Sequence, residues 1–403
     1  MKCSIVKKIS TIATGMIGIS LATATASLPK PVITNMGIDG THLAVYVSSA
    51  SNATLTLETK NQLSSNDWHS ITTRYATDPN SILNDYPFVE KTAAFYQVRI
   101  DQPGTTTNML YHGWSNVVQI SNGIVSTTIV PETGRIMQFN FLGTNGVFWE
   151  NRSLDGQSPD PDSSTWRNFG GDKSWPAPQA DWSAITGRGW PPPGGFDSMA
   201  NSVSQLGAEV VLQSPVDPSY GIQVTRRIRL FPGEPSMRVT TTYEQISDST
   251  NHVGIWIITQ LKDPERLFLP VAENSIFPDG YHVMSAQTPS DLVISNGLIS
   301  FSRNLQTQYK IGSDCETMLW IGSNGSLEIS APRLPGVTYP DSNSSVEIYT
   351  GTGTDGYVEL EQLGPLTQLL PGESISFGVN YTLHHRVLAD PQLEAERILG
   401  KKP

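Results

Sequence analysis

The sequence is poor in cysteine, in charged residues and in long hydrophobic runs, and each shortage narrows the class of protein. Only two of its 403 residues are cysteines. Charged residues make up 16% of the chain, against about 25% in an average soluble protein. Lys and Arg number 26 against 37 Asp and Glu, which gives a net charge of −11. This acidic balance argues against a nucleic-acid partner, which would require a basic patch or stripe.

The first 26 residues have the pattern of a secretory signal peptide. Three lysines precede a mild apolar run over residues 9–21, and Ala24-Thr25-Ala26 offers small residues for cleavage. The alternative is an anchor that stays uncleaved, but the run is shorter than the roughly 20 apolar residues of a membrane span. We therefore expect residues 1–26 to be removed and the protein to be secreted or periplasmic in a bacterium. No later segment is long and apolar enough to span a membrane.

Loss of the signal would leave Cys315 as the only cysteine, so no intramolecular disulfide is expected and the fold must rest on its core. Cys315 is either a nucleophile or a small buried hydrophobe, and the lack of a neighbouring His in the sequence favours the second. The seven histidines show no metal-ligand spacing. We expect no metal and no cofactor.

Short runs of alternating apolar and polar residues recur along the chain, for example at 43–47, 95–100, 223–230 and 237–243. This period of two, rich in Val, Ile, Thr and Tyr, predicts antiparallel strands and an all-β protein. The only convincing helix signal lies at 390–399, where Pro391 suits a first helical turn.

A Gly- and Thr-rich stretch near residues 104–108 predicts a domain boundary. We expect a small β-sandwich over 28–102, a large domain over 113–385 and a short helix or tail over 386–403. In the first of these, Leu55-Thr56-Leu57-Glu58-Thr59, Trp68 and Phe95-Tyr96-Gln97-Val98-Arg99 loosely resemble a fibronectin-III-like module. Such a module implies a spacer or docking role, with sugar binding through Trp68 as the alternative.

Residues 150–200 carry little strand pattern and many Trp, Pro, Gly and Asp residues. Loops of this length inside a compact domain are usually functional or disordered, and the aromatic residues argue against disorder. Asp172, Lys173 and Trp175 lie together in this stretch, and Trp190 follows. Aromatic rings that cover sugar faces, with polar groups for the hydroxyls, are typical of a small-ligand site. The alternative is that these residues only cap the open end of a sandwich.

Two glutamates alternate in the late segment Tyr357-Val358-Glu359-Leu360-Glu361-Gln362. On a strand, Glu359 and Glu361 would share one face, roughly 6–7 Å apart. In a partly desolvated cleft, burial and mutual repulsion would raise the pKa of one carboxyl, which suits general acid–base work. The alternative is an ordinary strand with two acids facing solvent.

The large domain resembles the galactose mutarotase-like superfamily, and an uncharacterised bacterial family within it. The matching segments, which follow one another in order, include Pro131-Glu132-Thr133-Gly134-Arg135-Ile136, Gly170 to Gln179, Gly254-Ile255-Trp256-Ile257-Ile258-Thr259-Gln260-Leu261, Lys310-Ile311-Gly312-Ser313-Asp314, Tyr339-Pro340-Asp341 and Val358 to Pro371. The resemblance implies a supersandwich of two large antiparallel sheets whose concave side holds a carbohydrate.

Aldose epimerases of this superfamily use a His as general acid and a late Glu as general base. Leu360-Glu361-Gln362 and Leu370-Pro371-Gly372-Glu373 match the region of the base, so the resemblance assigns that role to Glu361, with Glu359 in reserve. The histidines do not carry over, because this chain has Gly189-Trp190-Pro191 and Trp256 in their places. Trp can stack on a sugar but cannot deliver a proton.

Three hypotheses follow for the function. The first is an exported carbohydrate-binding or carbohydrate-processing protein. The second is an active aldose epimerase or lyase-like enzyme, with Glu361 as base and Lys173, Lys310 or Asp172 as the acid. The third is a structural or adhesive envelope protein in which the domain is only a scaffold. The candidate catalytic residues are Glu361, Glu359, Asp172 and Lys173, and the candidate sugar-binding residues are Arg135, Trp175, Trp190, Trp256, Lys310, Asp314 and Tyr339.

Overall fold

The computed structural model describes residues 31–39, 42–49, 53–60, 69–76, 80–85, 95–101, 104–206, 209–354 and 356–400. The chain divides into two compact units: residues up to Gly104 with Pro232–Glu234, and Thr105–Phe231 with the residues from Pro235 onward. The expected signal peptide, residues 1–26, and Trp68 lie outside the described residues. Within the described ranges, no helix has the length and apolar character needed to cross a membrane.

The described residues of the first unit form two three-stranded antiparallel sheets. One sheet has the order β1 (Val32–Asp39), β2 (His42–Ser48), β5 (Asn80–Asp85), and the other β4 (His69–Ala76), β3 (Ala53–Lys60), β6 (Phe95–Asp101). Buried side chains from both sheets, among them Val45, Leu57 and Leu83, form one core. The fibronectin-III-like character of this small sandwich stays a prediction.

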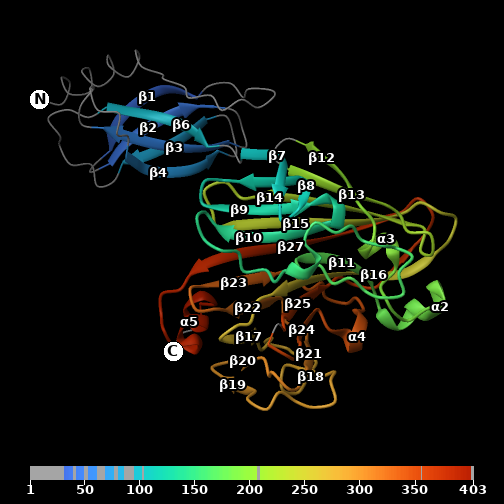
Figure 1. Ribbon diagram of the computed structural model, residues 1–403. Coiled ribbons are helices and arrows are strands. Elements are labelled where there is room, and N and C mark those ends of the chain that lie inside the picture. Colours follow the sequence, from blue (N-terminus) through green and yellow to red (C-terminus); the bar gives the residue numbers. More distant parts are fainter. Residues whose placement is uncertain are drawn as a thin grey trace, which may run out of the picture. The chain divides into compact units, whose positions relative to one another are not determined.

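The second unit is built on two large antiparallel sheets (Figure 1). The eleven-stranded sheet has the order β18 (His282–Val283), β21 (Tyr309–Ser313), β24 (Val346–Thr350), β25 (Val358–Leu363), β16 (Asn251–Leu261), β11 (Asp172–Ala177), β10 (Arg135–Phe141), β9 (Val125–Val130), β8 (Trp114–Ser121), β7 (Gly104–Tyr111), and β26 (Thr367–Leu369) also pairs with β16. The ten-stranded sheet has the order β12 (Ser202–Leu206), β13 (Glu209–Val216), β14 (Ile222–Leu230), β15 (Ser236–Gln245), β27 (Ser374–His385), β23 (Gly325–Ser330), β22 (Thr317–Ile321), β17 (Arg266–Pro270), β20 (Leu298–Phe301), β19 (Val293–Ser295).

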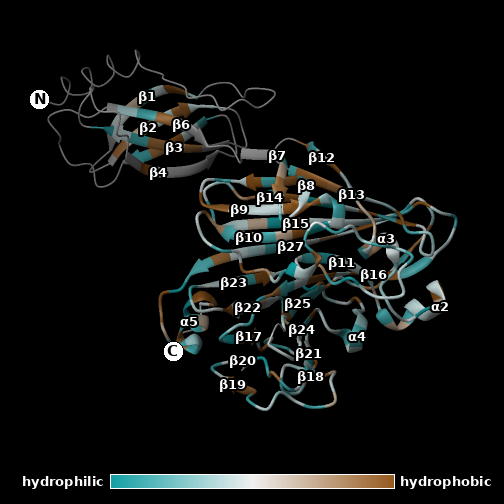
Figure 2. Cartoon of the chain, in the orientation of Figure 1, coloured by the Kyte–Doolittle hydropathy of each residue, from teal (hydrophilic) through white to brown (hydrophobic). Residues whose placement is uncertain are grey.

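A hydrophobic core joins these two large sheets. Along β14, buried and more exposed residues alternate, as the period of two in the sequence predicts. Figure 2 shows hydrophobic and hydrophilic stretches interspersed over the strands of the two large sheets. The core cluster combines Ile257 and Leu360 from the eleven-stranded sheet with Val239 and Tyr381 from the ten-stranded sheet. The prediction of an all-β, antiparallel sandwich is therefore confirmed.

Helices are few and short in the described part of the chain. They are η1 (Pro131–Thr133), η2 (Arg152–Leu154), η3 (Gln179–Asp181), α2 (Trp182–Thr186), α3 (Gly194–Asp197), α4 (Pro340–Asn343) and α5 (Pro391–Ile398). The Asp390 side chain caps α5 by accepting hydrogen bonds from the backbone N–H groups of Gln392 and Leu393, and Pro391 occupies the first turn.

One part of the expected loop over residues 150–200 is a strand. Residues 172–177 form β11, which pairs along its whole length with β16. All six residues of β11 are buried. A strand that is covered on both faces loses the alternation of polar and apolar residues, and here it also contains Pro176. The sequence pattern therefore missed the strand that brings Lys173 and Trp175 into the sheet.

Candidate functional site

One face of the eleven-stranded sheet carries a group of charged and polar side chains. Lys173 pairs with Ile258, Ile258 with Glu361, and Glu361 with Glu347, across four neighbouring strands. Directly paired residues in adjacent strands point to the same face. These residues therefore form a row across β11, β16, β25 and β24.

Two parallel rows flank this one on the same face. In the first, Gln260 pairs with Glu359, Glu359 with Tyr349, and Tyr349 with Lys310. In the second, Trp175 pairs with Trp256 and Trp256 with Leu363. We call this surface the charged face and define it by Lys173, Gln260, Lys310, Glu347, Tyr349, Glu359 and Glu361.

Lys310 holds two carboxylates of the charged face. Its Nζ lies 2.7 Å from Glu347 Oε2 and 3.0 Å from Glu361 Oε2. Burial alone would lower the pKa of Lys310, but the two carboxylates outweigh it and raise that pKa above its ordinary value. Trp256 donates its indole N–H to the same Glu361 oxygen at 2.7 Å. Lys310 is therefore a fixed cation, and Glu361 is anchored by two donors.

Lys173 is held more loosely. Its Nζ lies 3.5 Å from Glu359 Oε1, an oxygen that also accepts a 2.9 Å hydrogen bond from Gln260 Nε2. Burial lowers the pKa of Lys173 to about 8, although Glu359 opposes the shift. Burial also raises the pKa of Glu359. Lys173 is therefore held less firmly in its charged form than Lys310 is.

The charged face reaches solvent at one edge. The side chains of Lys310 and Glu359 are 23% and 12% exposed, whereas those of Glu361 and Lys173 are 1% and 2% exposed. Partly exposed aromatic rings lie beside this edge: the Tyr357 ring is 4.6 Å from that of Trp149 and 6.3 Å from that of Tyr349. Glu359 rather than Glu361 is therefore the carboxylate that a ligand reaches first.

The expected stacking residues form a cluster of tryptophans that is mostly buried. Trp175 and Trp256 are buried, with ring centroids 5.5 Å apart. Trp190, 46% exposed, packs against Trp166 and Trp175 at 5.2 and 5.9 Å. Of the three predicted platforms, only Trp190 therefore offers a ring surface to solvent.

Asp197 organises this cluster. Its Oδ1 accepts hydrogen bonds from Arg135 Nη2 at 2.7 Å and Trp175 Nε1 at 2.8 Å, and its Oδ2 accepts one from Trp166 Nε1 at 2.7 Å. The side chains of Arg135 and Asp197 are each 1% exposed. Arg135 also donates to the Gly170 carbonyl at 2.8 Å. Arg135, one of the sugar-binding residues predicted from the sequence, is therefore a buried cation that supports the tryptophan cluster.

Asp172 lies on the opposite face from Lys173. It pairs with Thr259, and its Oδ2 accepts 2.7 Å hydrogen bonds from Thr259 Oγ1 and Tyr381 OH, while Arg226 forms an ion pair with its Oδ1. Because neighbours on a strand point to opposite faces, Asp172 and Lys173 cannot serve the same site. Asp172 links the two large sheets instead of joining the catalytic candidates.

Asp314 and Tyr339 are also engaged away from the charged face. Asp314 accepts hydrogen bonds from Ser275 Oγ at 2.7 Å and Ile276 N at 2.8 Å. The Tyr339 hydroxyl accepts one from Leu334 N at 2.8 Å. Both are buried, so their placement fits a role in holding loops rather than in touching a ligand.

Sequence reasoning missed four members of the site: Glu347, Tyr349, Gln260 and Asp341. The alternation in Val346-Glu347-Ile348-Tyr349-Thr350 repeats that of the Glu359 strand, and it could have identified the first two. Asp341 lies close enough to Glu347 for their charges to interact, and burial raises the pKa of both carboxyls. Nothing in the local sequence signals that contact.

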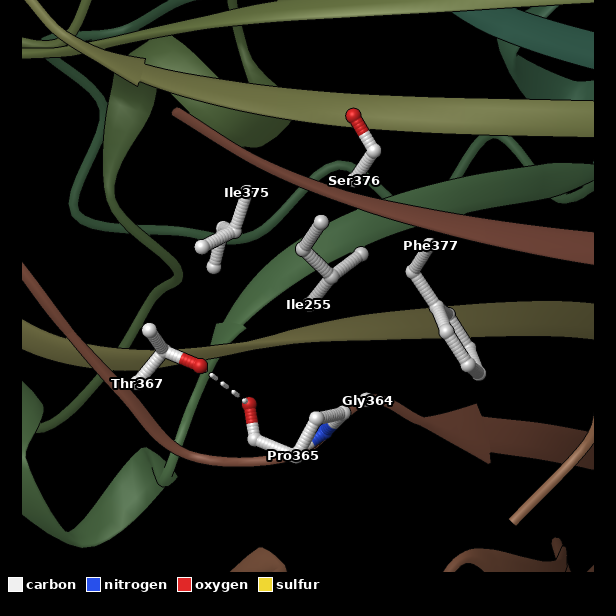
Figure 3. A pocket seen from close by; sticks show the side chains of 7 residues that line it. All are labelled: Ile255, Gly364, Pro365, Thr367, Ile375, Ser376 and Phe377. Atoms are coloured by element: carbon white, nitrogen blue, oxygen red, sulfur yellow. Dashed lines mark hydrogen bonds between the residues drawn. The ribbon is translucent and has the colours of Figure 1, made fainter. Parts of the chain in front are cut away.

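A separate pocket of about 150 Å³ lies elsewhere in the second unit. It is lined by Ile255, Gly364, Pro365, Thr367, Ile375, Ser376 and Phe377 (Figure 3). None of these lining residues carries a charge, so the pocket offers no acid–base chemistry. The described ranges also contain no group of three or more His, Cys, Asp or Glu residues placed to hold a metal ion.

Known structures that this chain resembles include proteins described as a candidate aldose 1-epimerase or as related to galactose mutarotase. A candidate aldose 1-epimerase from Klebsiella pneumoniae is 13% identical, with a TM-score of 0.46 over 73% of this chain and 86% of that chain. A galactose mutarotase related enzyme from Lactobacillus acidophilus is 10% identical, with a TM-score of 0.41 over 68% and 98%. A galactose mutarotase-like protein from Clostridium acetobutylicum is 9% identical, with a TM-score of 0.44 over 71% and 99%.

No curated protein matches the sequence. One family model, described as a domain of unknown function (DUF4380), matches residues 116–384, about two thirds of the chain. The chain therefore belongs to the DUF4380 family.

Proposed function

We propose that this protein is exported and binds a carbohydrate at the open edge of the charged face. The observation that carries the proposal is the position of Glu359, a carboxylate that reaches solvent with Tyr349 and Tyr357 beside it. A sugar has hydroxyl groups around its rim and apolar C–H patches on its faces. A carboxylate and an ammonium can bind the hydroxyls, and aromatic rings can cover the faces.

The residues have distinct roles in this proposal. Glu359 and Lys310 contact the hydroxyl groups, because their side chains reach solvent. Tyr349, Tyr357 and Trp149 supply ring surfaces at the same edge. Glu361, which the family resemblance assigns as the base, lies deeper and holds Lys310 in place.

A glycan array tests the proposal, followed by calorimetric titration of the hits with the full chain. We expect Glu359→Gln to weaken saccharide binding at least tenfold, which corresponds to about 1.4 kcal/mol. Glu328→Gln is the matched control, since this partly exposed acid lies on β23 of the other sheet and pairs with His384. An array without any saccharide hit would remove the proposal and leave the protein as a scaffold.

A second candidate function is proton transfer to the bound sugar, as in aldose epimerisation. It is favoured by Lys173, whose pKa of about 8 and contact with Glu359 suit a general acid that is not a histidine. Of the three acids expected from the sequence, Asp172 faces the other way and Lys310 is fixed as a cation. The test follows the change in optical rotation of freshly dissolved aldoses with and without the protein. If the protein accelerates this change for no aldose, the epimerase function is eliminated.

A further inference from the structure

We infer that the sugar bound at this edge carries a protonated amine, so that amino sugars are preferred over neutral and acidic saccharides. This inference rests on the proposed carbohydrate function and names the class of ligand for the same site. Three features carry it: a carboxylate beside aromatic rings, an excess of hydrogen-bond acceptors, and the local balance of charge.

The first feature is the surroundings of Glu359. Its Oε1 accepts hydrogen bonds from Gln260 and Lys173, whereas its Oε2 has no partner among the described residues. Tyr349 is its cross-strand partner, and Tyr357 lies close enough for the Glu359 charge to raise its pKa, after burial. A free carboxylate oxygen beside aromatic rings is the arrangement that binds an ammonium group, through an ion pair and cation–π contacts.

The second feature is a surplus of acceptors. Glu361 Oε1 and Gln260 Oε1 are buried, and neither has a hydrogen-bond partner in the part of the chain that the structure describes. Both residues lie on the charged face, next to Glu359 along the strand or across it. A buried acceptor without a donor costs about 1–3 kcal/mol. Both oxygens are sealed from solvent, but their uncompensated negative charge density favours a cation at the edge, and an ammonium group with three donors and no acceptor suits it better than a hydroxyl or an acetamide does.

The third feature is charge. Four carboxyl groups, those of Asp341, Glu347, Glu359 and Glu361, interact with two lysines on this face. Lys310 is committed to Glu347 and Glu361, so its charge is already balanced. A uronate or a phosphorylated sugar would bring another anion to a face with four carboxyl groups and two lysines, where burial already disfavours negative charge.

The experiment compares four probes by calorimetric titration of the full chain at about pH 6: chitosan tetrasaccharide, chitin tetrasaccharide, cellotetraose and tetragalacturonate. We expect chitosan tetrasaccharide to bind at least tenfold more tightly than cellotetraose or chitin tetrasaccharide, and tetragalacturonate to bind most weakly. Glu359→Gln removes most of this preference while cellotetraose affinity changes less, and Glu328→Gln keeps it.

The outcomes separate the inference from the proposed function. Equal binding of chitosan tetrasaccharide and cellotetraose overturns the amino-sugar inference and leaves carbohydrate binding intact. Binding of none of the four, together with an empty glycan array, ends both. Spermine serves as a cation without a sugar: if it binds as tightly as chitosan tetrasaccharide and competes with it, charge alone explains the preference and the inference fails.

Discussion

Lys310 Nζ lies 2.7 Å from Glu347 Oε2, and this contact joins the paired strands β21 and β24 on the charged face. The Glu347 side chain is fully buried, and Glu361, the second partner of Lys310, is 1% exposed. A buried carboxylate without a cation is strongly destabilising. One lysine therefore compensates two acids that the fold needs in one place.

Replacement of Lys310 by Met should destabilise the protein by about 3–5 kcal/mol near neutral pH, because two buried carboxylates lose their cation. The double variant Lys310→Met/Glu347→Gln should recover part of this loss. Burial already raises the pKa of Glu347 well above its ordinary value. A raised pKa in the folded state favours folding at low pH and loses that contribution as pH rises. The deficit of Lys310→Met should therefore shrink as the pH falls. Urea denaturation of wild type and Lys310→Met at several pH values measures this difference in the free energy of unfolding.

Lys262→Met is the control for this comparison. Lys262 Nζ donates to the Gly146 carbonyl at an exposed position. We expect a change within about 0.5 kcal/mol. If Lys310→Met lowered the free energy of unfolding no more than Lys262→Met does, the ion pairs of Lys310 would not contribute to stability.

Asp197→Asn should destabilise the tryptophan cluster by about 3–5 kcal/mol, because the buried Arg135 would lose its only carboxylate partner among the described residues. In Asn, an NH₂ group replaces one of the two carboxylate oxygens of Asp197. This donor would face an N–H of Trp166, Trp175 or Arg135, so at least one hydrogen bond would be lost. The tryptophan emission spectrum and the urea midpoint should therefore change together.

The matched control for Asp197→Asn is Glu265→Gln. Glu265 pairs with Arg386 at 2.9 Å, but its side chain is 42% exposed and Arg386 has other acceptors. Exposed pairs contribute about 0–1 kcal/mol. An Asp197→Asn loss no larger than that of the control would show that the buried pair does not hold the cluster together.

The sequence predicts best where polar and apolar residues alternate along a strand, as they do in β25 although all six of its residues are buried. The alternation around Glu359 and Glu361 placed both on one face, and the structure has them there with Gln260 and Glu347 as cross-strand partners. It fails where that alternation is missing. β11 shows no alternation, so Asp172 and Lys173 were taken as one polar group although neighbours on a strand point apart.

Asp341 illustrates a second limit. Asp341, Ser342 and Asn343 have φ angles of 48°, 62° and 69°, a run of left-handed residues without glycine. Such residues cost roughly 1–3 kcal/mol each and persist only where tertiary contacts impose them. Here Ser344 Oγ donates to the Asp341 carbonyl at 2.9 Å, and Tyr339 N donates to Asn343 Oδ1 at 2.8 Å. No local pattern could predict that this turn brings Asp341 to Glu347.

Lys173 gives the last prediction, a pH dependence of stability. Burial lowers its pKa to about 8 in the folded protein, whereas an unfolded chain has a lysine pKa of about 10.4. Between these values the unfolded chain binds the proton and the folded protein does not, so stability should rise with pH. Relative to Lys173→Met, the wild-type free energy of unfolding should increase by up to roughly 3 kcal/mol from about pH 8 to pH 10.5. Chemical denaturation of both proteins across this range provides the measurement.

Lys262→Met, at an exposed lysine, should show no such trend. A difference between wild type and Lys173→Met that stays constant with pH would mean that Lys173 keeps an ordinary pKa, and would remove it as a general acid near neutral pH.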